Sequence, residues 1–490
     1  MELVLALDAG TTGVRTVAFD TRLEVVDESY RELSQFFPSP GEVEHDPAEI
    51  TALAVSTLGE VATRLRAGGH VVAALGITNQ RETTVGFDRA TGEAFQRAIV
   101  WQDRRTADFC RELDEAGHGP EVRRTTGLVL DSYFSASKMR WMLERGVADA
   151  AREPSFATVD SWLLWSLTGG RDGGVFATEP SNASRTMLMD LVTLDWSAPM
   201  AQLFGVNPSM LATVRPSSTG FGTVSPEAVP ELAGVAITGI LGDQQSALFG
   251  QACFNPGLVK ATYGTGAFVL ANAGTSVPEI ADGLITTVAW DLGAFGPASY
   301  ALEGSAFVAG AAVQWLRDLG IIAASHELEA LAASVPDSAG AQFVPAFTGL
   351  GSPFWRADAR GAITGLSRGV GKGEIARALV EALAYQVRAM TEAFRRGGVE
   401  LKELRCDGGA AAMDLLLSLQ ATNSKVPVRR SSTLEATARG AASIAGLEIG
   451  LWSSLEELES RWRGASRFEP ADSVAVDAGY AAWCRAIERA

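Results

Sequence analysis

Short apolar runs separated by longer helix-like segments dominate the hydrophobic pattern of this chain. Residues 3–7, 71–77 and 235–241 are largely apolar and continuous, as strands buried on both faces of a parallel sheet are. Residues 160–167 and 374–393 have the length and composition of helices. Strands that alternate with helices in this way predict an α/β fold.

Two stretches of the chain echo each other. An apolar run leads into DAGTTG at 8–13 and then into a second strand-like run at 14–19. Past the middle, residues 257–262 lead into YGTG at 263–266 and then into 267–270. Each pattern predicts a strand, a tight Gly-Thr turn and a strand. Because 490 residues exceed what one core accommodates, we predict two related domains, 1–250 and 251–490, facing one another.

Polar residues follow two of the predicted strands, and the chain ends in helix-forming sequence. TNQRE at 78–82 and GDQQ at 242–245 each come directly after an apolar run. Functional residues of open α/β sheets gather beyond the carboxyl ends of strands, so these two segments are candidates. From about residue 455 the chain is Glu-rich, which predicts covering helices rather than a site.

Composition and charge exclude several classes of function. The chain has 41 Lys and Arg against 58 Asp and Glu, a net charge of −17, so neither nucleic acid nor anionic lipid is an expected partner. Its four cysteines form no CxxC pair and its four histidines show no metal-ligand spacing. The N-terminus lacks the basic region of a signal peptide, and no apolar run approaches the roughly 18 residues of a membrane span. A cytoplasmic protein without a membrane span is therefore expected.

The two Gly-Thr turns are candidate phosphate sites. A turn without side-chain bulk exposes backbone N–H groups, and two opposed turns would hold the terminal phosphates of ATP from both sides. No GxxxxGK[ST] motif offers a Walker alternative. Asp8 lies beside the first turn, where a Mg²⁺ ion between carboxylate and phosphate would relieve their repulsion. The alternative role for Asp8 is an Asx-turn cap on the hairpin.

LRCDGG at 404–409 precedes a helix-like run at 410–420. A Gly-Gly turn between a strand and a helix lets a flat ligand approach the backbone, which makes it a candidate seat for adenosine. Taken alone, such a turn is more often a simple connection.

Longer motifs carry a resemblance that covers nearly the whole chain. They are GITNQRETT at 76–84, IVWQDRRTA at 99–107, TGLVLDSYFSASKMRW at 126–141, SNASRTML at 181–188, GDQQSALFGQ at 242–251, TYGTGAF at 262–268, YALEGSAFVAGAAVQWLRD at 300–318 and PAFTGLGSPFW at 345–355. The sequence resembles the FGGY carbohydrate kinases of the actin/Hsp70/hexokinase ATPase superfamily, and GITNQRETT with GDQQ resembles the branch that acts on glycerol. The resemblance implies an α/β fold of two actin-like (ribonuclease H-like) domains with an active-site cleft between them.

The resemblance also implies which residues bind the acceptor. The residues that it assigns to hydrogen bonds with the polyol hydroxyls are Arg81, Glu82, Tyr133, Asp243 and Gln244. The residues that it assigns to the walls around the carbon face are Trp101 and Phe268. A triol needs this mixture of forked polar groups and aromatic walls. Without the resemblance, Arg81 and Glu82 would be interpreted as a solvated charge pair and Trp101 as a core residue.

Asp243 is the expected catalytic base. Phosphoryl transfer requires alignment, charge neutralisation and a carboxylate that accepts the proton of the attacking hydroxyl. Asp243 follows a predicted strand and precedes a helix-like segment, so a rigid element would aim it; capping of that helix is the alternative role. Asp8 and Asp243 are together the predicted Mg²⁺ ligands.

For ATP, the resemblance places residues on both domains. The terminal phosphates are assigned to Thr11, Thr12, Gly13 and Arg15 on one side and Gly264 and Thr265 on the other, the ribose and base to Gly310 and Gln314, and the α-phosphate and adenosine to Gly409 and Met413. Ala9, Gly13, Met413 and Asp414 depart from the usual family pattern, and these departures bear on nucleotide affinity and preference.

The favoured interpretation is therefore an ATP- and Mg²⁺-dependent kinase that converts glycerol to glycerol 3-phosphate, acting as a homodimer or homotetramer. An FGGY kinase for another polyol or a sugar is the nearest alternative, although Trp101 and Phe268 argue for a small pocket. An actin-like or Hsp70-like ATP-driven module would have no need of GITNQRETT and GDQQ. A catalytically silent sensor would have no need of an intact Asp243.

Overall fold

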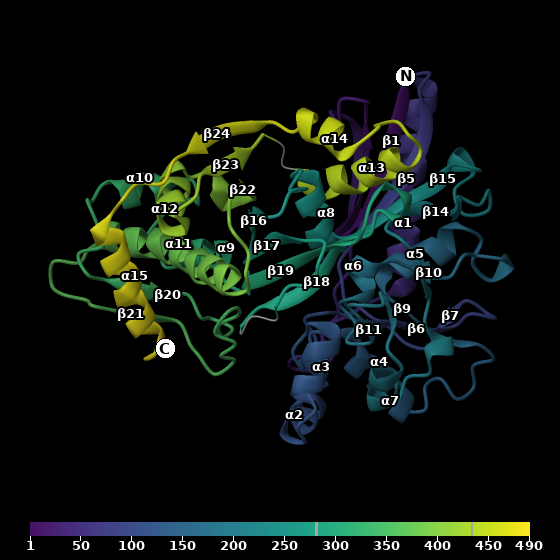
Figure 1. Cartoon of the computed structure of the whole chain (residues 1–490), viewed down its shortest axis with the longest axis horizontal. Coiled ribbons are helices and arrows are strands. Elements are labelled where there is room, and N and C mark those ends of the chain that lie inside the picture. The colour runs from purple at the N-terminus through teal and green to yellow at the C-terminus, as the bar shows by residue number, and fades with distance from the viewer. Residues whose placement is uncertain (280–282, 433–434) are drawn as a thin grey trace.

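The computed structural model describes residues 1–279, 283–432 and 435–490, and its elements divide into two lobes, each built on one large mixed sheet (Figure 1). In spatial order, the first sheet consists of β14 (Ser218–Thr223), β15 (Ala236–Gly242), β5 (Val71–Asn79), β1 (Glu2–Ala9), β2 (Gly13–Phe19) and β3 (Val25–Glu32). The second consists of β18 (Ile285–Trp290), β19 (Ser299–Ala306), β17 (Ala267–Gly274), β16 (Leu258–Tyr263), β22 (Glu403–Asp407), β23 (Val428–Ser431) and β24 (Gly464–Phe468).

Helices cover both sheets, and small sheets complete the first lobe and the outer edge of the second. The helices are α1 (Pro47–Ala67), α2 (Ala107–Glu115), α3 (Gly119–Thr126), α4 (Ser135–Glu144), α5 (Val159–Leu167), α6 (Pro180–Ala183), α7 (Ala198–Phe204), α8 (Asp243–Gly250), α9 (Gly310–Asp318), α10 (Glu327–Ala333), α11 (Lys372–Arg396), α12 (Asp414–Ser424), α13 (Ala436–Glu448), α14 (Leu455–Arg461) and α15 (Val474–Ile487). The small sheets pair β4 (Glu44–His45) with β8 (Ala98–Ile99), β7 (Glu93–Ala94) and β9 (Pro154–Ala157) with β6 (Val85–Asp88), β10 (Ala177–Thr178) with β13 (Thr213–Val214), β11 (Met189–Asp190) with β12 (Asp195–Trp196), and β20 (Gln342–Val344) with β21 (Ala362–Thr364).

The two large sheets repeat one topology. In the order β3-β2-β1-β5-β15, the first three strands are antiparallel, and β1, β5 and β15 run parallel. The order β19-β17-β16-β22-β23 has the same pattern, with β16, β22 and β23 parallel. Each of the two predicted Gly-Thr turns joins the central strand of this five-strand order to its antiparallel neighbour, β1 to β2 and β16 to β17. The predicted α/β class with two related domains is confirmed.

Strand β1 shows why its residues form a strand buried on both faces. Leu3, Leu5 and Leu7 point into one core together with residues of α1 and α5. The alternate residues Val4 and Ala6 point into another core, which contains residues of α8 and α13. Because side chains alternate between the two faces of a strand, a continuous apolar run is what a sheet covered on both sides requires.

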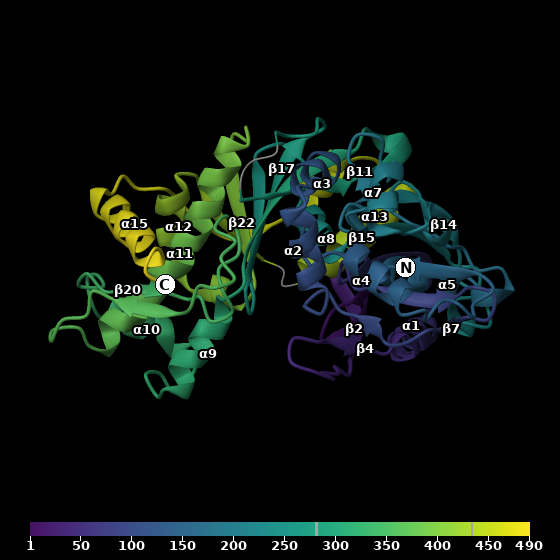
Figure 2. The same cartoon turned by 90° about the horizontal axis from the view of Figure 1, so that it is seen from below.

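A third large core lies on the second sheet. Residues of β16 and β17 pack there against α11 and α12, which cover the side of the sheet away from the first lobe (Figure 2). The opposite side of the same sheet contributes Leu258, Leu270 and Ala301 to the core that contains α8 and α13. The lobes are therefore joined through a shared apolar core.

Helix α13 comes from the C-terminal part of the chain but packs on the first sheet, against β1, β5 and β15 (Figure 1). Its contact with α8 is tight: a β-carbon at Gly440 would lie 1.9 Å from the carbonyl oxygen of Ser246. At Gly250 the same addition would lie 1.9 Å from the carbonyl oxygen of Ala436. The division of the chain at residue 250 stays a prediction, and α13 lies beyond that position while it completes the first lobe.

Two local expectations differ from the structure. The helix expected over 410–420 begins only at Asp414, after a 3₁₀ turn at Gly409–Ala412, because Arg430 holds the carbonyl oxygens of Ala411 and Ala412. The predicted covering helices are α14 and α15, and β24 lies between them as an edge strand on β23. None of the helices in the described ranges combines the length and apolar character that a membrane crossing requires.

Candidate active site

The first Gly-Thr turn joins β1 to β2 and leaves Thr12 exposed at its tip. The Gly10 amide donates to the Gly13 carbonyl at 2.9 Å, and the Tyr30 hydroxyl donates to the Thr12 carbonyl at 3.2 Å. A β-carbon at Gly13 would lie 2.4 Å from the Tyr30 ring. The packing of Tyr30 therefore gives a physical reason for glycine at a position that departs from the family pattern.

The second turn joins β16 to β17, with Gly264 and Thr265 exposed. The amide of Ala309 donates to the Thr265 carbonyl at 2.8 Å, and that of Gly310 donates to the Gly264 carbonyl at 3.0 Å. A β-carbon at Gly310 would lie 2.6 Å from the Gly264 carbonyl oxygen, so Gly310 supports this turn. Gln314, one turn further along α9, donates its amide to Asp318 at 2.7 Å.

Asp8 lies at the end of β1 among charged residues. Burial, the Asp243 carboxylate and Glu435 raise the pKa of its carboxyl, Arg15 lowers it, and the net result is a pKa of about 7. Arg15 contacts Glu435 at 2.5 Å, and its guanidinium lies 5.5 Å from the centre of the Tyr30 ring. Asp8 and Asp243 thus carry a mutual repulsion that a proton or a cation between them would relieve.

Two carboxylates suit Mg²⁺, which commonly uses one or two carboxylates together with phosphates and waters. Within the three described ranges, no group of three or more His, Cys, Asp and Glu residues has the arrangement of a metal site. The raised pKa of Asp8 and its repulsion from Asp243 are what a site built for a divalent cation has in the absence of that cation. The residues present therefore fit Mg²⁺ held jointly with phosphate.

Asp243 is the first residue of α8, directly after β15. One of its carboxylate oxygens accepts a hydrogen bond from the backbone N–H of Gln244 at 2.7 Å, and the same oxygen lies 3.2 Å from Nε of Arg81. About 30% of the side chain remains exposed. The carboxylate is therefore oriented by its own helix and by Arg81, and one side stays accessible to an acceptor.

Four fully buried charged residues, Arg81, Glu82, Arg185 and Glu303, form what we term the charge cluster. Glu303 accepts hydrogen bonds from both terminal nitrogens of Arg81 at 2.7 and 2.9 Å, and lies 3.3 Å from Arg185. Nε of Arg185 donates to Glu82 at 2.6 Å. Arg81 and Glu82 are thus not a solvated charge pair.

The pKa values of the cluster follow from burial and pairing. At Glu303, burial raises the pKa, but Arg185 and Arg81 outweigh that effect and lower it to about 2. At Glu82, burial raises the pKa despite Arg185 and Arg81. The Glu303 carboxylate is therefore the anion that holds the two guanidinium groups in the interior.

Trp101, a predicted wall of the acceptor site, and Tyr133, a predicted partner of its hydroxyls, lie together beside the first phosphate turn. The rings of Trp101 and Tyr133 are 5.5 Å apart, and the indole N–H of Trp101 donates to the Thr11 hydroxyl at 2.9 Å. Buried Lys138 donates to the carbonyl oxygens of Tyr133 and Phe134 at 2.8 and 3.1 Å. Trp101 is partly exposed and bridges two predicted sites, so it is not a simple core residue.

Two further residues predicted to contact the acceptor, Gln244 and Phe268, meet across the two lobes. The side-chain oxygen of Gln244, on α8, accepts a hydrogen bond from the ammonium of Lys260, on β16. The same ammonium lies 3.4 Å from the carbonyl oxygen of Phe268, on β17. The structure thus brings Gln244 and Phe268 together through a lysine that the sequence pattern did not indicate.

On the predicted adenosine side, Gly408 has φ +88° and packs against β16, where a β-carbon would lie 2.4 Å from the Tyr263 carbonyl oxygen. Gly409 is exposed, as a ligand seat requires. Met413 is buried in the core of the second lobe, and Asp414 pairs with Arg430. Two positions that depart from the family pattern are therefore occupied by a core side chain and an ion pair.

Comparison with known proteins identifies the family. A model of the N-terminal domain of the FGGY family of carbohydrate kinases matches residues 3–250, and one of its C-terminal domain matches residues 259–449. The chain belongs to the FGGY family of carbohydrate kinases.

Relatives of this FGGY chain match it from end to end. A glycerol kinase of Stenotrophomonas maltophilia is 48% identical over 99% of the chain and 97% of that protein. A glycerol kinase of Aromatoleum aromaticum is 49% identical over 100% of the chain and 99% of that protein. The crystal structure of Plasmodium falciparum glycerol kinase with ADP has a TM-score of 0.94 and 33% identity, covering 100% of this chain and 98% of that one.

The FGGY motifs contain buried charged residues to which the sequence assigned no role. Arg185 lies in SNASRTML, Lys138 in TGLVLDSYFSASKMRW and Glu303 in YALEGSAF. Lys260 and Glu303 are single charges inside strands that are otherwise buried. A lone charge in a buried strand is the signal that would have found them, because such a charge requires a partner.

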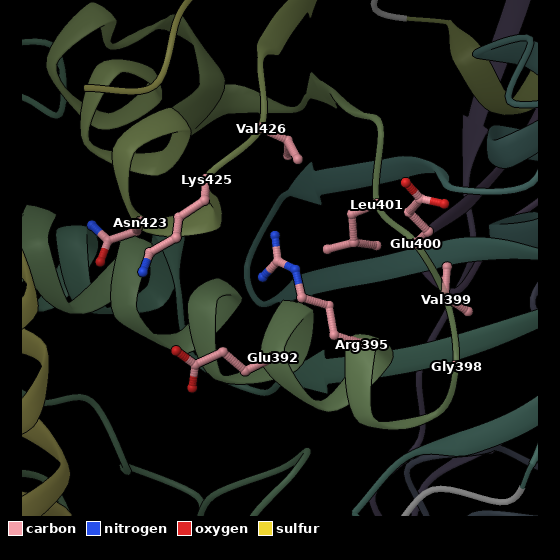
Figure 3. A pocket seen from close by; sticks show the side chains of 9 residues that line it. All are labelled: Glu392, Arg395, Gly398, Val399, Glu400, Leu401, Asn423, Lys425 and Val426. Atoms are coloured by element: carbon pink, nitrogen blue, oxygen red, sulfur yellow. The ribbon is translucent and has the colours of Figure 1, made fainter. Parts of the chain in front are cut away.

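A cavity of about 670 Å³ lies elsewhere in the second lobe of this FGGY kinase, at the ends of α11 and α12 (Figure 3). Arg395 and Lys425 bring positive charge to it, and Glu392 and Glu400 bring negative charge. No predicted site residue of the described chain lines this cavity. It is therefore separate from the candidate active site.

Proposed function

We propose that this FGGY kinase is a glycerol kinase that transfers the γ-phosphoryl group of ATP to glycerol, giving sn-glycerol 3-phosphate and ADP. This reaction is the first step of glycerol catabolism. The observation that carries the proposal is the identity of 48–49% to glycerol kinases over at least 97% of their length. The arrangement of acceptor residues around Asp243 supports it independently.

The acceptor site suits a small triol. The forked, charged group of Arg81 lies between Asp243, at 3.2 Å, and Glu82, at 3.8 Å. The aromatic rings of Trp101 and Tyr133 lie 5.5 Å apart. Polar groups that pair each hydroxyl also reject an analogue that lacks one, because a buried protein group is then left unpaired. Trp101 and Phe268 would wall the carbon face and limit the size of the acceptor.

In the proposed reaction, Asp243 accepts the proton of the attacking hydroxyl while Arg81, at 3.2 Å, holds the carboxylate in place. The backbone amides of the two Gly-Thr turns, with Thr11, Thr12 and Thr265, would bind the terminal phosphates. Asp8 and Asp243 would hold Mg²⁺, which supplies neutralisation of the phosphate charge when it is bound. The exposed Gly409 would seat adenosine on the second lobe.

We further propose a cytoplasmic homodimer or homotetramer. The net charge of −17 supports a protein that binds neither nucleic acid nor anionic membranes. Size-exclusion chromatography with light scattering measures the oligomeric state directly.

A coupled ADP-release assay with ATP and Mg²⁺ tests the proposed function. Glycerol, xylulose, gluconate, ribulose, erythritol and dihydroxyacetone are compared as acceptors, and the Asp243→Asn protein provides the background rate. Strong stimulation by glycerol alone is the expected result. Stimulation by a larger sugar would instead identify an FGGY kinase for that sugar, and ATP hydrolysis indifferent to every polyol would identify an ATP-driven module.

A further inference from the structure

Lys260 occupies an unusual position for a lysine. Its side chain is fully buried on β16, inside the core region between the lobes. No carboxylate oxygen of the described residues lies within ion-pair distance, 4.0 Å, of its ammonium. A buried lysine without a direct ion pair is expensive in free energy, so its retention requires another reason.

The hydrogen bonds of Lys260 point to that reason. Its ammonium donates to the side-chain oxygen of Gln244 and lies 3.4 Å from the backbone carbonyl oxygen of Phe268. Both partners are predicted acceptor residues, and they belong to different lobes. Lys260 therefore joins the acceptor side of α8 to the strand that carries the second phosphate turn.

The chemistry of the lysine fixes the orientation of the Gln244 amide. An ammonium has three donors and no acceptor, so only the oxygen of the amide can face it. The NH₂ group of Gln244 must then face the other way. No residue that the structure describes accepts a hydrogen bond from this NH₂ group, and the residue is partly exposed. Gln244 is thus held with a free donor beside Asp243.

The charges around Lys260 keep it protonated at neutral pH. Burial lowers the pKa of its ammonium, Asp407, Asp243 and Glu303 oppose that effect, Arg81 adds to it, and the net result is a pKa of about 8. The three carboxylates come from three different elements, β22, α8 and β19. A neutral amine would be able to accept as well as donate, so the positive charge is what makes the orientation of Gln244 unambiguous.

We propose that Lys260 is a positioning residue that orients the Gln244 amide, so that Gln244 presents an N–H donor to a hydroxyl oxygen of the acceptor. The inference rests on the proposed glycerol kinase function and adds a residue that acts through another one. It predicts that Lys260 sets the affinity for the acceptor and leaves the affinity for ATP unchanged.

A double-mutant cycle tests this role, with the Lys260→Met, Gln244→Met and double variants of the full-length protein. Each single variant is expected to raise the KM for glycerol roughly 10-fold, which corresponds to about 1.4 kcal/mol, and to change the KM for ATP less than about twofold. Because Lys260 acts through Gln244, the double variant is expected to match the single ones rather than multiply their effects. A roughly 100-fold effect of the double variant would overturn the proposal.

Asn272→Leu is the matched control. Asn272 is buried on β17 of the same sheet, and its amide donates to the carbonyl oxygens of Cys253 and Phe254 at 2.9 Å each. This variant is expected to lower the unfolding temperature and to leave the KM for glycerol unchanged. If Lys260→Met also changed only the unfolding temperature, Lys260 would be structural and the inference wrong.

Binding measured without turnover adds a second readout. Glycerol is expected to raise the unfolding temperature of the unmodified protein, and to raise that of Lys260→Met and Gln244→Met less at the same concentration. An equal rise in all three proteins would overturn the role of Lys260 while leaving the proposed function intact. Absence of glycerol-dependent ADP release by the unmodified protein would overturn both.

Discussion

Replacing Glu303 by glutamine removes the anion at the centre of the charge cluster while keeping nearly the same shape. The carboxylate accepts hydrogen bonds from Arg81 at 2.7 and 2.9 Å and lies 3.3 Å from Arg185, and it is fully buried. In the Glu303→Gln protein, two buried guanidinium groups would share Glu82 as their remaining partner inside the cluster. We expect a large loss of stability.

The magnitude follows from two independent arguments. The pKa of Glu303 is lowered from 4.5 to about 2, and a difference of this size is worth about 3 kcal/mol. Breaking a buried ion pair by removing one partner typically costs about 3–5 kcal/mol. For a domain of about 250 residues, 3 kcal/mol lowers the unfolding temperature by roughly 6–12 °C.

Differential scanning calorimetry of the two proteins measures this difference, and its pH dependence makes the test specific. Since the folded pKa is the lower one, the carboxylate contributes its full stability above pH 4.5 and loses it as the pH falls towards 2. The gap between the unfolding temperatures of the unmodified and Glu303→Gln proteins should therefore narrow below pH 4.5.

Glu153→Gln is the control, because Glu153 forms an exposed ion pair with Arg89. Such pairs contribute about 0–1 kcal/mol, so this variant should unfold within about 4 °C of the unmodified protein. If Glu303→Gln behaved like Glu153→Gln, or if its temperature gap did not depend on pH, the assignment of Glu303 as the stabilising anion would be refuted.

Three further predictions concern catalysis, the metal site and packing. Asp243→Asn should lower kcat on the order of 10²–10⁴-fold in the ADP-release assay while the protein stays folded, and near-normal turnover of the folded variant would exclude Asp243 as the base. Asp8 has a folded pKa of about 7, so its ionisation increasingly destabilises the metal-free protein as the pH rises from 3.8 to 7. In EDTA, Asp8→Asn should therefore raise the unfolding temperature more at pH 8 than at pH 5. An equal rise at both pH values would contradict this prediction. Gly440→Ala should lower the free energy of unfolding by about 1–3 kcal/mol, because its new β-carbon would lie 1.9 Å from the carbonyl oxygen of Ser246. Gly220→Ala is the control, because its new β-carbon would meet no neighbour within 4 Å. Equal unfolding temperatures of the two variants would disprove the tight contact between α8 and α13.

The features that the sequence predicts well depend on local pattern. Both Gly-Thr turns lie between strands that are neighbours in the chain, so periodicity and turn residues are sufficient to find them. Asp243 follows a strand and begins a helix, which the boundary between the two patterns indicates. Helix α11 is long and amphipathic enough to be seen directly.

The features that the sequence leaves open depend on distant partners. Arg81 was a candidate acceptor ligand, but its main partner, Glu303, lies 222 positions away, and no spacing rule connects them. Likewise, the hydrogen bond from Lys260 to Gln244 joins residues of different lobes, so it can be identified only from the three-dimensional arrangement of the two lobes. The sheet that α13 covers and the pairing of β24 with β23 are decided by tertiary packing rather than by propensity.

The return of α13 to the first sheet has a consequence for biosynthesis. The N-terminal strands leave the ribosome first, but Val4 and Ala6 of β1 pack against α13, which ends at Glu448. The lobe that begins synthesis first is therefore completed only after most of the second lobe has been made, and until then one apolar face of its sheet is available to chaperones or to other nascent chains. A fragment that stops at residue 250 would keep that face uncovered permanently, whereas the same fragment mixed with residues 251–490 has the missing helix available to dock.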